Sequence, residues 1–277
     1  MKKVLSNLRV KEVMLMTGFF SIGIFFGVEN LEQLWQPKVV IGFISVFFLF
    51  LGIYAFNGLC GFKEDKDNPR LSFSLNKNFF YASVILLKTL SLLGFYFLGP
   101  LFFKLAIISM LLWIYYSWPK YGAKYVPIAG SLVHFVTQII HFLLGYLLLK
   151  DISLLAVLVS LYFSLLFVAG HLNHELIDHE ADKLKKIKTN AVYFGPENGQ
   201  MASILIFGMS FLYSILIIFF YRETILFFIP FQLAFVAQLF IYFKKYKSQF
   251  DALKFRGIYR SLYFYAGLFA LLAKGFT

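Results

Sequence analysis

Apolar residues in this sequence are grouped in runs that are long enough to cross the hydrocarbon core of a membrane, or nearly so. A helix needs about 20 such residues to span that core. Hydrophobic residues make up 60% of the chain, charged residues make up only 14%, and the mean hydropathy is +0.75. These values are outside the range of soluble domains. The sequence therefore predicts an all-α, polytopic membrane protein with nine transmembrane helices, at residues 13–28, 38–60, 79–97, 101–117, 126–148, 153–173, 201–220, 224–243 and 258–275.

The spans leave no room for a separate soluble domain, so we expect residues 1–277 to form a single integral-membrane domain. The N-terminal segment MKKVLSNLRVKEV is too polar to be a cleavable signal peptide, so we expect the first span to be retained. Cys60 is the only cysteine. An intrachain disulfide and a zinc site built on several thiolates are therefore excluded.

The distribution of Lys and Arg predicts the orientation of the chain. With the N-terminus in the cytoplasm, 20 of the 26 Lys and Arg residues lie on the cytoplasmic side, as the positive-inside rule requires. We expect the protein in the inner (plasma) membrane. The net charge of +12 then reflects topology and contacts with anionic lipid or diphosphate, and we expect no nucleic-acid partner. Lys88 and Lys104 lie inside or near spans, and we expect both to snorkel toward the outer interface.

Acidic residues are concentrated in two short segments, one after the second span and one at the end of the sixth. Asp178 and Asp182 are four residues apart, so on a helix they share one face, and His174 extends the same row. Two adjacent carboxylates repel each other unless a cation lies between them, and oxygen ligands suit Mg²⁺. A solvated helix end explains this pair alone equally well. Half of the 14 acids fall in the two segments: Glu64, Asp65, Asp67, Glu175, Asp178, Glu180 and Asp182.

Both acidic segments lie on the predicted cytoplasmic side, so they can face each other. Asn57 and Asp65 from the first, together with Asp178 and Asp182 from the second, would then hold two or three Mg²⁺ ions. Such ions, with lysines around them, form a receptor for a diphosphate group.

Two further polar patterns accompany these segments. Tyr116 and Lys120, after the fourth span, offer a phenol and an ammonium, although an aromatic belt is the better explanation for this piece alone. His134, Gln138 and His141 lie at i, i+4 and i+7 of the fifth span. This stripe is equally compatible with a binding path and with interhelical hydrogen bonds.

Together these motifs resemble the UbiA superfamily of intramembrane prenyltransferases, and the resemblance covers nearly the whole chain. The family has an N-x-x-x-D-x-x-x-D motif after its second helix, a Y-x-x-x-K motif after its fourth and a D-x-x-x-D motif after its sixth. The corresponding segments here are Asn57…Asp65, Tyr116-Ser-Trp-Pro-Lys120 and Asp178-His-Glu-Ala-Asp182. The last motif continues as in the family, with Lys183, Thr189, Ala191 and Gly195.

The resemblance implies helices around a central cavity that opens on the cytoplasmic side, where Mg²⁺ binds a polyprenyl diphosphate. Departure of diphosphate leaves an allylic carbocation, which a hydrophobic acceptor attacks. It implies Asn57, Asp65, Asp178 and Asp182 as metal ligands, the three aspartates being catalytic together with Tyr116 and Lys120, which bind the diphosphate. Further substrate-binding candidates are Arg70, Lys124, Lys183, His134 and Gln138.

One departure from the family pattern concerns the first motif, where Gly61 stands in place of the middle aspartate and Gly58 where an acid is frequent. This departure has three explanations. Glu64 or Asp67 replaces the missing aspartate as a metal ligand, the first site binds its metal ion weakly, or the protein catalyses a related reaction with different requirements. Candidate acceptors include a quinone-precursor ring, a haem or chlorin, and a glycerol-phosphate lipid.

Three alternatives remain open from the sequence. A UbiA-type terpene cyclase would close the cation on its own chain. A non-catalytic binding or transport protein is less favoured, because transporter sites lie near the membrane midplane and these acids lie at helix ends. A zinc site from His171, His174 and Asp178 is the third.

Overall fold

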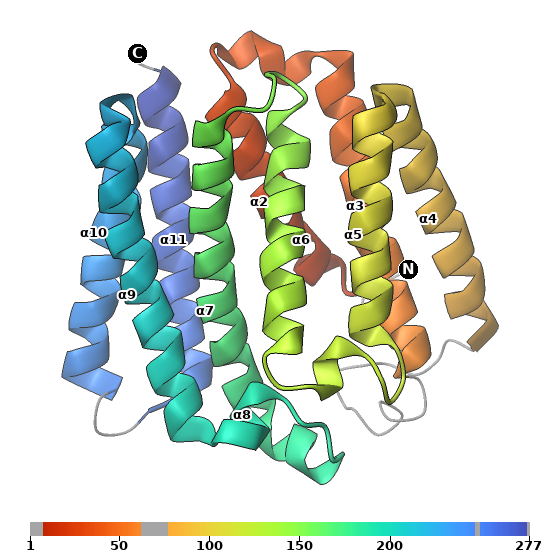
Figure 1. Ribbon diagram of the computed structural model, residues 1–277, viewed down its shortest axis with the longest axis vertical. Helices are drawn as coiled ribbons and strands as arrows, with labels where there is room; N and C mark the ends of the chain where they lie inside the picture. Colours follow the sequence, from red (N-terminus) through yellow and green to blue (C-terminus); the bar gives the residue numbers. More distant parts are fainter. Residues whose placement is uncertain (1–7, 62–76, 247–249, 276–277) are drawn as a thin grey trace. The chain divides into compact units, whose positions relative to one another are not determined.

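The computed structural model describes residues 8–61, 77–246 and 250–275, and every regular element in these ranges is helical (Figure 1). Each of the nine predicted spans coincides with a long helix, so the all-α prediction is confirmed for this part of the chain. The long helices are α2 (Val10–Gly27), α3 (Pro37–Cys60), α4 (Lys77–Leu98), α5 (Pro100–Ser117), α6 (Ala129–Tyr146), α7 (Leu154–Leu184), α9 (Pro196–Phe220), α10 (Ile225–Ile241) and α11 (Ala252–Gly275). The short elements are η1 (Leu31–Trp35), η2 (Ala123–Tyr125), α8 (Asn190–Phe194), η3 (Arg222–Thr224) and the π-helical η4 (Tyr242–Tyr246).

Seven helices in the described ranges are long and apolar enough to cross a membrane. The apolar part of α2, Glu12–Gly27, is shorter, and α11 carries Lys254, Arg256 and Arg260 in its first half. Nine crossings and a cytoplasmic N-terminus therefore stay predictions. The helix α7 continues well past the predicted span end at residue 173, and this extension carries the second acidic segment.

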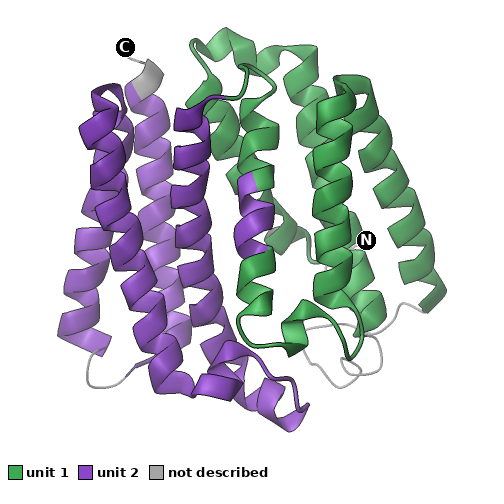
Figure 2. Ribbon diagram, in the orientation of Figure 1, with its two compact units in different colours: residues 1–133, 140–152 green, residues 134–139, 153–277 purple. Residues whose placement is uncertain are grey.

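The chain divides into two compact units (Figure 2). Unit 1 comprises residues 1–133 and 140–152, and unit 2 comprises residues 134–139 and 153–277. The helix α6 contributes to both, because its segment 134–139 belongs to unit 2. The single domain over residues 1–277 stays a prediction.

Glycines permit close helix packing in unit 1. A Cβ at Gly23 of α2 would overlap the carbonyl of Phe142, and one at Gly145 of α6 would overlap the carbonyl of Phe20. The backbones of α2 and α6 therefore approach as closely as small residues allow in membrane helix pairs.

The side chain of Lys88 also lies in unit 1, between α3 and α4. Its stem packs beside Gly52, and its Nζ lies 4.5 Å from the centre of the Phe56 ring. Phe56 is near the Cys60 end of α3, whereas the predicted outer interface is at the Leu98 end of α4. The prediction that Lys88 snorkels outward is therefore wrong, because its cation–π contact with Phe56 directs the ammonium toward the Cys60 end of α3.

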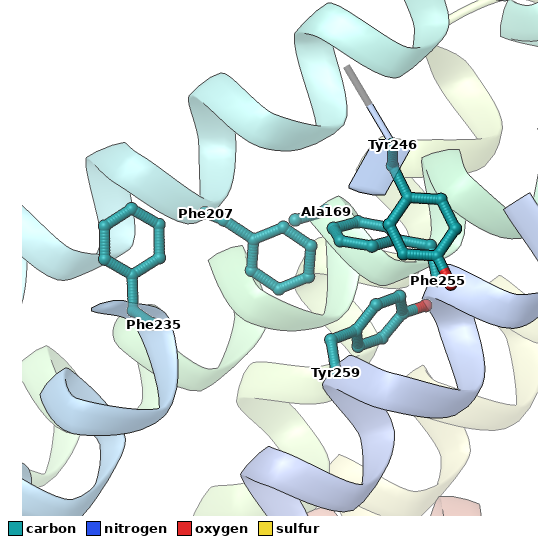
Figure 3. Close-up of a cluster of buried hydrophobic side chains, with 6 residues drawn as sticks. All are labelled: Ala169, Phe207, Phe235, Tyr246, Phe255 and Tyr259. Atoms are coloured by element: carbon teal, nitrogen blue, oxygen red, sulfur yellow. The ribbon is translucent and has the colours of Figure 1, made fainter. Parts of the chain in front are cut away.

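An aromatic core in unit 2 fixes the part of α7 that precedes the acidic row. Tyr259 of α11 donates a hydrogen bond from its hydroxyl to the Gly170 carbonyl at 3.2 Å. Ser203 of α9 likewise donates to the Ala169 carbonyl at 2.7 Å. The buried side chains of this core, shown in Figure 3, are Ala169, Phe207, Phe235, Tyr246, Phe255 and Tyr259.

Candidate active site

One polar row runs along the C-terminal half of α7. His171, Glu175, Asp178 and Asp182 follow each other at spacings of four, three and four, so they share one helix face. Their burial falls along the row: Glu175 is buried, while Asp178 and Asp182 are half-buried. The two aspartates are therefore accessible to a ligand, and Glu175 belongs to the interior of unit 2.

Arg256 of α11 lies beside this row. Its Nη1 is 3.1 Å from Nδ1 of His174, and the same Nδ1 is 3.6 Å from Oδ2 of Asp178. A guanidinium offers only donors, so Nδ1 of His174 accepts this hydrogen bond and carries no proton. The result is a permanent positive charge next to the acidic row, supplied by the last helix.

Glu175 holds the short helix α8 against α7. Its Oε1 accepts a hydrogen bond from Nδ2 of Asn190 at 3.1 Å, and its Oε2 accepts one from the backbone N–H of Ala191 at 3.3 Å. Thr189 caps α8 by accepting from the N–H of Val192. The free N–H groups at a helix start favour a carboxylate. The motif residues Thr189, Ala191 and Gly195, the last with φ of 87°, thus shape the segment that follows the acidic row.

The predicted stripe on α6 is divided between the two units. The His134 ring lies 4.0 Å from that of His171 and 5.1 Å from that of Phe167, all in unit 2. Gln138 is fully buried in the same unit. His141 belongs to unit 1, where its Nε2 is 2.8 Å from the hydroxyl of Ser109.

The remaining described candidates occupy the ends of helices. In unit 1, Asn57 is in the last turn of α3, and Tyr116 is in the last turn of α5 and packs on Trp113. Lys120 is exposed in the following turn with φ of 67°, and Lys124 lies over the Tyr125 ring.

Gly130, at the start of α6, brings two of these candidates near each other, because a Cβ there would contact both the Tyr116 ring and the backbone of Lys124. Lys183 is exposed at the end of α7 in unit 2. Asp65 and Arg70, with Glu64 and Asp67, lie outside the described residues.

A model of the UbiA prenyltransferase family matches residues 14–267 of this sequence. The chain belongs to this family. The resemblance inferred from the motifs is thereby confirmed, and the matched range contains the three segments that carry it.

Solved structures of UbiA proteins share the fold. A digeranylgeranylglyceryl phosphate synthase matches with a TM-score of 0.74 at 18% identity over 100% of both chains. A UbiA homolog from Archaeoglobus fulgidus matches with a TM-score of 0.76 at 18% identity, over 99% of this chain and 98% of its own. The same homolog bound to GPP and Mg²⁺ gives 0.77 at 14% identity, over 98% and 99%. Among curated proteins, none matches this sequence significantly.

The donors of this UbiA-family chain fit Mg²⁺ better than zinc. Within the described ranges, no group of three or more His, Cys, Asp or Glu side chains is close enough to hold a metal ion. The zinc alternative is therefore wrong, because His171 pairs with Glu175 and His174 with Arg256. Mg²⁺ commonly keeps several waters and uses one or two carboxylates plus substrate phosphates. The accessible pair Asp178 and Asp182 suits that requirement.

The structure adds Arg256 to the residues that the sequence named, and it gives new contacts to Glu175, named only as an acid of the second segment, and to His171, named only as a candidate zinc ligand. Glu175 and His171 continue the row of Asp178 and Asp182, and this spacing was a readable signal in the sequence. Arg256 had no such signal, because only the fold brings α11 beside His174.

Proposed function

We propose that this UbiA-family protein is a Mg²⁺-dependent prenyltransferase, which moves a prenyl group from a polyprenyl diphosphate to a hydrophobic acceptor. The supporting observation is the accessible pair Asp178 and Asp182, placed on one face of α7 and followed by the family's T-x-A-V-x-x-G segment. The A. fulgidus homolog bound to GPP and Mg²⁺ supports the same substrate class.

Each candidate residue has a role in this proposal. Asp178 and Asp182 hold Mg²⁺, with Asn57 and Asp65 as the partners that the family pattern implies. Bound Mg²⁺ supplies Lewis-acid assistance to the departure of diphosphate. Tyr116 and Lys120 bind the diphosphate oxygens as neutral and charged donors. Additional substrate contacts come from Arg70, Lys124, Lys183, His134 and Gln138.

The position of the acidic row also supports an ionisation mechanism. The half-buried aspartates lie at the end of a long apolar helix, whose earlier residues are buried among aromatic side chains. Such surroundings keep water from an allylic cation, and the faces of aromatic rings attract it. We propose that the active site lies on the cytoplasmic side of the plasma membrane.

The first test measures diphosphate release from geranyl diphosphate by the purified protein, with and without Mg²⁺. We expect Mg²⁺-dependent release that falls at least about 100-fold in the double variant Asp178→Ala and Asp182→Ala, because both carboxylates act in the same step. Glu180→Ala is the matched control, since Glu180 is on the same helix but exposed and off the row. Release that survives in the double variant would exclude this assignment, and cyclic hydrocarbons as the main product without an added acceptor would indicate cyclisation in place of transfer.

A further inference from the structure

A buried cluster of ionisable side chains lies one to two turns inward from the aspartate pair. It consists of His134 from α6 and of His171 and Glu175 from α7, and each of these side chains is less than one-tenth exposed. The Nε2 of His171 is 3.1 Å from Oε1 of Glu175, and the ring of His134 packs on that of His171. The roles proposed above use only one of the three, as a substrate contact.

Burial makes the partners of Glu175 important. An isolated carboxylate is expensive to bury, so a buried glutamate needs hydrogen-bond donors or a charged neighbour. Its other partners, Asn190 and the N–H of Ala191, are neutral donors. His171 is the ionisable side chain that lies against the Glu175 carboxylate, and His134 is a second imidazole beside that pair. Arg256 and Asp178 both contact His174 of α7.

The cluster lies at a depth that the reacting carbon of a substrate bound at the aspartate pair would reach. A helix rises 1.5 Å per residue, so Glu175 lies about 4.5 Å and His171 about 10 Å from Asp178 along α7. A diphosphate held at Asp178 and Asp182 with its prenyl chain directed into the apolar part of unit 2 would place C1 within this interval.

We propose that His134, His171 and Glu175 form the proton-accepting site of the reaction, an inference that rests on the proposed function. The bond between C1 and the diphosphate oxygen breaks, and its electron pair leaves with diphosphate. An electron pair of the acceptor then forms the new bond to C1. The acceptor atom that has bonded to C1 loses a proton, whose bonding electrons stay with the acceptor, and the proton moves to the imidazole of His134. If no acceptor is present, the same site takes a proton from the cation itself, which leaves a hydrocarbon.

Geranyl diphosphate with Mg²⁺ and no added acceptor tests this site without knowledge of the natural acceptor. Proton loss from the cation gives hydrocarbons, and capture by water gives alcohols. We expect wild-type protein to form both, and we expect the hydrocarbon share of the products to fall at least about ten-fold in His134→Phe and in Glu175→Gln, whatever the amount of diphosphate released. His134→Phe preserves an aromatic ring against Phe167, so packing is retained. His141→Gln, on the same helix but in unit 1, should keep the wild-type share.

The results that would contradict the inference differ from those that would contradict the proposed function. A hydrocarbon share that is unchanged in His134→Phe and Glu175→Gln, or wild-type products that consist of alcohols only, would overturn the inference alone. Absence of Mg²⁺-dependent diphosphate release from wild-type protein would overturn the proposed function and the inference with it.

A second measurement does not depend on turnover. The chain has five histidines, so a spectrum of ¹⁵N-histidine-labelled protein can be assigned with single variants. On addition of unreactive geranyl thiolodiphosphate with Mg²⁺, we expect the ring nitrogens of His134 and His171 to shift and those of His141 to stay in place. Unchanged resonances of His134 and His171 would contradict the proposed depth of the site.

Discussion

Two rows of polar side chains in this protein have the same helical spacing but different surroundings. The row on α7, from His171 to Asp182, stays within unit 2, where its members contact α8 and His134 of α6, and where Arg256 of α11 contacts the adjacent His174. The row on α6 is divided: His134 and Gln138 belong to unit 2, and His141 belongs to unit 1. Spacing along a helix thus predicts which residues share a face, but the neighbouring helices decide whether they act together.

The α6 and α7 rows also differ in the partners that their side chains contact. His141 has a neutral partner, the Ser109 hydroxyl, and its ring packs edge-on against Phe50. In the α7 row, Glu175 brings together a helix start and a histidine, and Asp178 neighbours a histidine that binds an arginine. Charge accumulates in the α7 row, so we assign chemistry to it and a packing role to His141.

The largest effect on folding should come from Glu175→Ala. This change removes a buried carboxylate from His171 and from the start of α8, and we expect it to lower the free energy of unfolding by about 3 kcal/mol. Unfolding of the detergent-solubilised protein measures this loss, and Glu180→Ala, with an 83% exposed side chain, is the control. Equal losses in the two variants would remove the distinction between buried and exposed acids of α7.

Arg256→Gln tests whether α11 contributes charge to the α7 row. Loss of the guanidinium should raise the KM for geranyl diphosphate about ten-fold and change kcat less, because a fixed cation near the row favours the bound anion. Arg260→Gln changes an exposed arginine one turn further along α11 and is the matched control. A KM that responds equally to both changes would indicate a general effect of net charge.

His141→Phe tests whether His141 of α6 has a packing role only. It should lower the free energy of unfolding by about 1 kcal/mol, the usual value of a hydrogen bond between membrane helices, and leave diphosphate release unchanged. The double variant with Ser109→Ala should recover part of the loss, because no buried hydroxyl is then left without its partner. A large loss of diphosphate release in His141→Phe would mean that the two histidines of α6 act together after all.

The smallest expected effect concerns pH and the start of α11. The backbone N–H of Lys254 donates to the Asp251 carboxylate, and this hydrogen bond, with the nearby Lys254 ammonium, lowers the pKa of Asp251 below its usual value. A lowered folded pKa stabilises the fold above the unfolded pKa and loses this contribution as the pH falls through the folded value. The difference in Tm between wild type and Asp251→Asn should therefore shrink below about pH 4, the usual range for aspartate. A difference that does not change with pH would show that this carboxylate contributes nothing to the start of α11.

Much of the fold was predictable because membrane-length apolar runs translate directly into helices. The ends of α3 and α5 were predicted at Cys60 and Ser117, and both are confirmed. The predicted end of the sixth span was too early, because hydropathy marks where apolar character stops, whereas α7 continues through a polar segment to Leu184.

Contacts between distant parts of the chain were not predictable. The pairing of Arg256 with His174 and the division of the α6 stripe both depend on which helices become neighbours. The direction of the Lys88 side chain depends on its contact with the Phe56 ring of α3. The shared Mg²⁺ ligands Asn57 and Asp65 stay a prediction, since the first residue belongs to unit 1 and the second lies outside the described residues.

The most direct measurement is a crystal structure of the protein with Mn²⁺, in place of Mg²⁺, and geranyl thiolodiphosphate. The account predicts an anomalous peak about 2.2 Å from carboxylate oxygens of Asp178 and Asp182, shared with the thiolodiphosphate oxygens. A metal ion and a ligand located away from α7, with these two carboxylates bound only to solvent, would contradict it.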